Sequence, residues 1–128
     1  MPRQRATFRA SVGFALQGLL HVVRTQRNFR IHLAAALLAM GMGAWLHLSR
    51  EAWGLLLLTI GIVLEAEVFN TAAEVLVDLA SPRYHPLAKD VKDLAAGAVL
   101  LAAAIAVLIG LVLFLPPLCT RLLPLLPD

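Results

Sequence analysis

Glu67-Val68-Phe69-Asn70-Thr71-Ala72-Ala73-Glu74-Val75-Leu76-Val77-Asp78 places three carboxylates and an asparagine inside a long apolar segment. On a helix, its polar members fall on one face, within about 60° of the first carboxylate. We call these five residues the carboxylate stripe: Glu67, Asn70, Thr71, Glu74 and Asp78. An ionisable group near the centre of a bilayer costs about 2.5–3.5 kcal/mol, so the stripe predicts a functional site. Glu65 falls on the opposite face, about 160° away.

The composition predicts an all-α membrane protein with a single domain over residues 1–128. The chain has 128 residues, of which 60% are hydrophobic, and its mean hydropathy is +0.82. Soluble domains contain about 45–50% apolar residues. Three segments, 31–49, 52–79 and 94–115, approach or exceed the roughly 20 residues of helix that cross a bilayer.

The flanking segments carry weaker signals. Residues 8–30 begin with an amphipathic pattern that predicts a helix on the membrane surface, and we expect the chain to turn into the first span at 27–30. A polar start to a longer first span is the alternative. The prolines at 82 and 86 predict a break after the second span, and Pro116-Pro117 predicts the end of the third. In the tail, 116–128, the part from Leu118 onward is expected to be irregular.

The distribution of basic residues predicts the topology. Most of them precede the first span or separate the second from the third: Arg3, Arg5, Arg9, Arg24, Arg27, Arg30, Arg83, Lys89 and Lys92. The positive-inside rule then predicts a cytoplasmic N-terminus and an external C-terminus. The N-terminal segment lacks the pattern of a cleavable signal peptide, so we expect the first span to direct insertion. The net charge of +3 reflects topology, and no nucleic-acid partner is expected.

The spacing of the stripe suits a division of roles. Glu67 and Glu74 lie two turns apart on one face. A carboxylate in an apolar setting can accept a proton, and one nearer water can hold a hard cation such as Mg²⁺. Asn70 between them can bond a hydroxyl or phosphate oxygen. A polar packing face or an ion pathway is the alternative interpretation.

Lys92-Asp93 opens the third span at the level of Glu74. Lys92 can neutralise phosphate, and Asp93 can orient that lysine or bind a metal. Tyr84 and His85 in the preceding loop can close over a nucleotide. The other histidines, His21, His32 and His47, lie on separate elements, which disfavours a histidine metal site. The chain contains no P-loop and no protein-kinase motif, so a phosphoryl-transfer site here would be built from helix side chains.

These motifs resemble the prokaryotic diacylglycerol kinase family. The pattern E-x-x-N-T-A-x-E-x-x-x-D over 67–78 carries the resemblance, with His85-Pro-Leu-Ala and Lys92-Asp93-Leu-Ala-Ala-Gly97. Arg27-Asn28-Phe29-Arg30-Ile31-His32 and His85-Pro86-Leu87-Ala88-Lys89 are closer to its undecaprenol kinase branch. The resemblance covers about residues 8–117.

The resemblance implies a homotrimeric lipid kinase of the bacterial cytoplasmic membrane, with a surface helix, three membrane helices and active sites at subunit contacts. Such an enzyme transfers the γ-phosphate of Mg-ATP to a membrane lipid alcohol, here undecaprenol or diacylglycerol. Glu67 matches the catalytic base and Glu74 a metal-binding carboxylate. The groups around ATP are matched by Asn70, Tyr84, His85, Lys92 and Asp93.

One position departs from the family pattern. A second metal-binding glutamate is expected just before Arg27-Asn28, where this chain has Gln26. An amide can offer an oxygen to a cation but no charge.

From the motifs and the resemblance together, we expect an ATP-dependent lipid kinase that prefers undecaprenol. The alternatives are a small oligomeric channel or proton path lined by Glu67 and Glu74, and a catalytically impaired relative that binds lipid.

Overall fold

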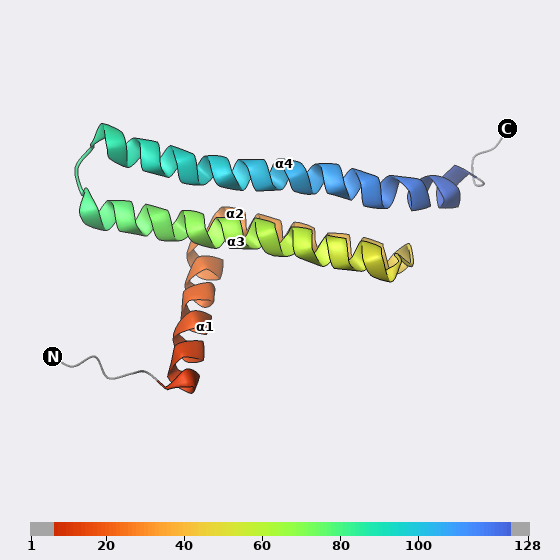
Figure 1. The fold of residues 1–128 in the computed structure, drawn as a ribbon, viewed down its shortest axis with the longest axis horizontal. Coiled ribbons are helices and arrows are strands. Elements are labelled where there is room, and N and C mark those ends of the chain that lie inside the picture. Colours follow the sequence, from red (N-terminus) through yellow and green to blue (C-terminus); the bar gives the residue numbers. More distant parts are fainter. Residues whose placement is uncertain (1–6, 124–128) are drawn as a thin grey trace.

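The structure, a computed structural model, describes residues 7–123, and its regular secondary structure in that range is all helical. Its helices are α1 (Phe8–Thr25), α2 (Arg27–Trp45), α3 (Arg50–Ala80) and α4 (Pro86–Leu122). Figure 1 shows α2, α3 and α4 running along the long axis of the molecule, with α1 extending crosswise from them. The all-α prediction is confirmed, and α3 provides the central packing surface for α2 and α4.

Two of the four helices, α3 and α4, are long and apolar enough to cross a membrane. The third expected span corresponds to α2, whose 19 residues include Asn28, Arg30 and His32 near its start. These polar residues keep α2 less hydrophobic than α3 and α4. The membrane crossing of α2 therefore stays a prediction.

The turn between the surface helix and the first expected span is shorter than predicted. It consists of Gln26 alone, whose extended backbone (φ −99°, ψ 113°) separates α1 from α2. The predicted turn at 27–30 is wrong, because these residues form the first turn of α2. Arg30 secures the junction by donating from Nη1 to the carbonyl oxygens of Val23 and Arg24, at 3.4 and 3.1 Å. These bonds satisfy acceptors at the end of α1.

The connection from α2 to α3 is a tight turn. α2 ends at Trp45, short of the predicted 49, because His47 adopts a left-handed conformation with φ 53°. The Leu48 N–H donates to Gly43 O at 3.1 Å, and the His47 N–H donates to Ala44 O at 3.2 Å. This pair of bonds is a Schellman motif. A Cβ at the buried Gly43 would lie 3.1 Å from a Leu48 methyl carbon, so glycine permits the close approach.

The last helix is longer than predicted at both ends. α4 begins with Pro86 at its first turn and passes through Pro116 and Pro117 to Leu122, so the predicted helix end at these prolines is wrong. The irregular structure expected from Leu118 is also wrong up to Leu122. Residues 124–128 of that tail, like 1–6, lie outside the described part of the chain. Thr120 Oγ1 donates to both proline carbonyl oxygens, at 2.9 and 3.1 Å. In an apolar environment, helix is the conformation that leaves fewest backbone groups unpaired.

The extended α4 reaches the far end of α2. The guanidinium carbon of Arg121 lies 5.1 Å from the centroid of the Trp45 ring, within range of a cation–π interaction. The carboxylate stripe lies toward the opposite end of the helices, near the loop from α3 to α4.

Candidate functional site

The stripe begins with a deeply buried carboxylate. Glu67 is 2% exposed and Thr71 is 3% exposed. They continue a row of buried residues along one face of α3, which begins with Leu56, Thr59 and Val63. Thr71 Oγ1 donates to the backbone oxygen of Glu67 at 2.9 Å, which satisfies the threonine without using the carboxylate. Charged side chains are rarely buried to this extent unless they are paired.

The partner of Glu67 comes from α2. His32 Nε2 lies 3.2 Å from Glu67 Oε1, at ion-pair distance. The contact lies outside hydrogen-bond geometry, and Oε1 has no hydrogen-bond partner among the described residues. Glu67 is therefore held beside a titratable group, with hydrogen-bonding capacity left for a ligand.

The next turn of the stripe forms a polar pair. Asn70 Nδ2 donates to Glu74 Oε1 at 3.1 Å, and both residues are half-buried. Asn70 Oδ1 is buried and has no partner in the described structure. The amide thus fixes the Glu74 carboxylate with its nitrogen while its oxygen stays free to bind a ligand.

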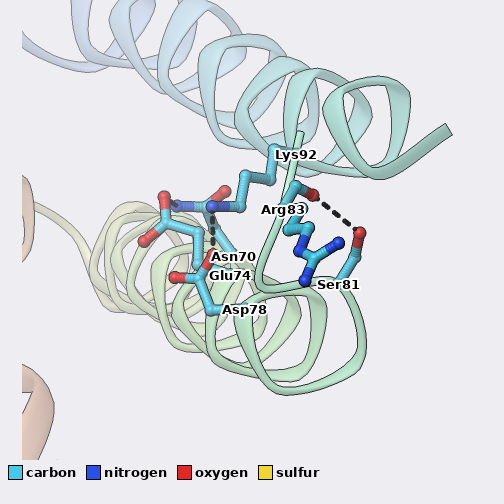
Figure 2. Close-up of polar contacts among 6 residues, drawn as sticks. All are labelled: Asn70, Glu74, Asp78, Ser81, Arg83 and Lys92. Carbon is cyan, nitrogen blue, oxygen red and sulfur yellow. Dashed lines mark hydrogen bonds and ion pairs between the residues drawn. The ribbon is translucent and has the colours of Figure 1, made fainter. Parts of the chain in front are cut away.

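The open end of the stripe is bridged to α4. Lys92 Nζ lies 2.5 Å from Asp78 Oδ1, and the two side chains are 40% and 68% exposed. Figure 2 shows Lys92 reaching from α4 toward Asn70, Glu74 and Asp78 on α3. The structure therefore joins two motifs that are 14 residues apart in the sequence into one polar cluster.

Asp93 does not orient Lys92, contrary to one of its two predicted roles. It pairs with Lys89, four residues earlier on the same helix. Neighbouring residues on a helix point about 100° apart, so Asp93 cannot share the direction of Lys92. The hydrogen bond from Lys89 to the Asp93 carboxylate, together with its charge, raises the pKa of Lys89.

The loop residues Tyr84 and His85 are not drawn into the stripe. Tyr84 is 83% exposed. His85 Nδ1 accepts a hydrogen bond from the Leu87 N–H at 3.2 Å and caps α4. In this structure, therefore, His85 positions the helix that carries Lys92. The role of both residues at a nucleotide stays a prediction.

The metal-binding residues predicted from the sequence belong to different elements. Glu74 belongs to the stripe, whereas Gln26 is the half-buried link between α1 and α2. Within 7–123, no three His, Cys, Asp or Glu side chains form a cluster able to hold a metal ion. Mg²⁺ at phosphoryl-transfer sites is commonly held by one or two carboxylates together with substrate phosphates. The oriented Glu74 carboxylate, next to the unpartnered Asn70 oxygen, fits that manner of binding.

An apolar groove of about 240 Å³ lies between α2, α3 and α4. Its walls are mainly alanine and aliphatic side chains, with Gly110 and Phe114 from α4. Its polar members are His32 and Thr59. His32 therefore contacts both the groove and Glu67. The sequence interpretation missed this role of His32, because it treated His21, His32 and His47 only as possible metal ligands. The one signal at His32 was its place at the end of the motif at 27–32.

Comparisons with known proteins identify the family of this chain. A family model for prokaryotic diacylglycerol kinase matches residues 13–114. The undecaprenol kinase of Bacillus subtilis is 45% identical over 102 residues, which are 80% of this chain and 83% of that protein. The diacylglycerol kinase of Synechocystis is 47% identical over 109 residues, which are 84% of this chain but only 62% of that protein. The diacylglycerol kinase of Escherichia coli K12 is 32% identical over 98 residues, 77% of this chain and 80% of that protein. The chain therefore belongs to the prokaryotic diacylglycerol kinase family of lipid kinases.

Proposed function

We propose that this protein transfers the γ-phosphate of ATP to the hydroxyl group of a membrane lipid alcohol, with undecaprenol preferred over diacylglycerol. The observation that carries the proposal is Glu67, a carboxylate that is 2% exposed, lies in a long apolar helix and has an oxygen without a hydrogen-bond partner. A general base in that position can meet a lipid headgroup where a water-soluble substrate would have poor access.

The proposed reaction assigns a part to each end of the stripe. Glu67 takes the proton of the lipid hydroxyl as that oxygen bonds to the γ-phosphorus and the bond to the β-phosphate oxygen breaks, which releases ADP. Lys92 and Asn70 bind phosphate oxygens, the first by charge and the second by its amide. Tyr84, His85 and Asp93 complete the ATP site. Glu74, with Gln26 contributing only a neutral oxygen, would hold Mg²⁺, which neutralises phosphate charge when bound.

The apolar groove supports a lipid substrate. An isoprenoid or acyl chain needs an apolar path that leads away from the reacting hydroxyl, and burial of such a chain contributes about 0.8 kcal/mol per methylene. The groove between α2, α3 and α4 offers such a path, and His32 connects it to Glu67. The preference for undecaprenol rests on the two motifs at 27–32 and 85–89.

We further propose that α2, α3 and α4 cross the cytoplasmic membrane while α1 lies on its inner surface. The N-terminus is then cytoplasmic, the C-terminus is outside, and ATP reaches the stripe from the cytoplasm. The crosswise direction of α1 and its exposed Phe8, Phe14 and Leu16 support a helix that lies in the interface.

A homotrimer completes the proposal. Glu65 is exposed on the opposite face of α3 from the stripe, in the middle of a spanning helix. An exposed carboxylate at that depth is costly in lipid, so a neighbouring subunit is the favourable partner. α4 has no fully buried residue in a single chain, which leaves its apolar surface for lipid or for other subunits.

The test uses purified protein in mixed micelles with Mg-ATP and either undecaprenol or diacylglycerol. We expect phosphorylated lipid from both, with a higher kcat/KM for undecaprenol, and loss of turnover in Glu67→Gln. Turnover of diacylglycerol alone would change only the substrate assignment. Absence of any phosphorylated lipid would refute the kinase reaction.

One alternative is still tied to a specific observation. Gln26 replaces a metal-binding glutamate, which favours an impaired, lipid-binding relative. That alternative predicts lipid binding without turnover, so the same assay decides it. The channel hypothesis gives no part to Lys92, whereas in the structure Lys92 is joined to the stripe.

A further inference from the structure

Within residues 7–123, His32 is the one residue outside the stripe that pairs with the buried carboxylate of Glu67 through a titratable atom. The two side chains come from different helices, 35 residues apart in the sequence. Their exposure differs sharply, since the His32 side chain is 25% exposed and the Glu67 side chain is 3% exposed. The histidine is therefore the more open member of the pair.

The charges around Glu67 point to the same residue. Two ionisable groups of the described residues face it: His32 from α2, at 3.2 Å, and Glu74, two turns along the same face of α3. From α4, the nearby cation Lys92 is already paired with Asp78. Glu74 brings a like charge, whereas a protonated His32 brings the opposite charge. A base that must be ionised in an apolar site thus has one neighbour able to keep it so.

We propose that His32 is a positioning residue for the general base: its Nε2, 3.2 Å from Glu67 Oε1, orients the carboxylate by charge and leaves its hydrogen-bonding capacity for the lipid hydroxyl. In the reaction, the hydroxyl proton passes to the Glu67 carboxylate while His32 keeps its own proton. The Glu67 carboxyl group releases that proton to solvent after the products leave, which returns the pair to its starting state. This inference rests on the proposed function of Glu67 as the base.

The test compares two substitutions at one position. His32→Leu removes both the polar contact and the charge, whereas His32→Gln keeps an amide N–H near the place of Nε2 but cannot ionise. His21→Gln is the matched control, because His21 is exposed on α1 and lies outside the proposed site. Phosphorylation of undecaprenol in mixed micelles is measured for each across about pH 5 to 8.

We expect His32→Leu to lower kcat at least about tenfold, with an unchanged KM for Mg-ATP. His32→Gln should recover most of kcat at the alkaline end. Its activity should fall at a pH at least about one unit higher than in the unmodified protein, because Glu67 has lost the cation that favours its ionised form. His21→Gln should match the unmodified protein throughout.

An unshifted pH profile for His32→Gln would overturn the proposal, even if His32→Leu failed to fold. A full kcat for His32→Leu would overturn it as well. The same assay separates this proposal from the role of Glu67 as the base. If Glu67 is not the base, Glu67→Gln retains turnover. If only the role of His32 is wrong, Glu67→Gln is inactive.

Discussion

The two halves of the carboxylate stripe differ although they share one face of α3. In the buried half, Glu67 and Thr71 are almost inaccessible, and the partner is a histidine from α2. In the open half, Glu74 and Asp78 are partly or fully exposed, and the cation comes from α4. A single face can therefore provide an apolar setting for proton transfer and a polar setting for phosphate, because different helices cover its two ends.

The break at Gln26 explains this difference. α2 begins at Arg27, little more than one turn before His32, and from there it runs beside α3 (Figure 1). On the N-terminal side of Arg27 the chain turns away into α1 (Figure 1). The last turns of α3 lie beside the start of α4. A single extended residue thus decides where the stripe becomes accessible.

The largest expected effect separates the two halves by kinetics. Glu67→Gln should lower kcat by about 10²–10⁴-fold while KM for Mg-ATP stays the same, because a proton acceptor is lost. Glu74→Gln should mainly raise KM for Mg-ATP, because charge near the phosphates is lost. Steady-state kinetics at several Mg²⁺ concentrations measures both. The division of roles is wrong if the two variants give the same pattern.

The next effect concerns the residue at the break. Gln26→Glu adds a carboxylate to the predicted metal site and should lower the half-saturating Mg²⁺ concentration about tenfold, which corresponds to about 1.4 kcal/mol. Gln26→Ala, which removes the amide oxygen, is the matched control and should raise it. A Mg²⁺ dependence that is unchanged in both variants would remove Gln26 from the metal site.

A smaller effect is expected far from the stripe. His47→Gly should stabilise the protein by about 1 kcal/mol, because a left-handed conformation strains a residue that has a Cβ. Reversible unfolding in mixed micelles measures the change, and His47→Ala, which keeps the Cβ, should not give it. Lipid phosphorylation should be unaffected, so this variant separates changes in stability from changes in chemistry.

The smallest expected effect comes from breaking the ion pair between Asp78 and Lys92 in the open half. A double-mutant cycle with Asp78→Asn and Lys92→Met should give a coupling free energy of unfolding of about 0.2–1 kcal/mol, because solvent reaches both side chains and screens the pair. Lys92→Met should also lower the rate of lipid phosphorylation. The loss should exceed what a change in stability of this size would cause, since Lys92 also binds phosphate. A coupling well above this range would indicate a structural role for the pair in place of a catalytic one.

Local patterns were sufficient for much of the fold. The apolar runs predicted the positions of α3 and α4, and the stripe was placed on one face because α3 is an unbroken helix. The predicted end at Pro116-Pro117 was wrong, because the rule that proline ends a helix assumes water for the freed carbonyl groups. The turn at 27–30 was misplaced because one extended residue leaves no compositional signal.

The sequence by itself determined which polar residues align along α3 and that they lie in apolar surroundings, since both follow from helix periodicity and residue type. Only the tertiary structure decided which of them are buried and who their partners are. His32 reaches Glu67, and Lys92 reaches Asp78, through the packing of helices whose relative positions depend on side-chain contacts far apart in the chain. The spacing of residues along one helix determines which face each of them occupies. Their burial and their side-chain partners are determined only when a second helix packs against that face.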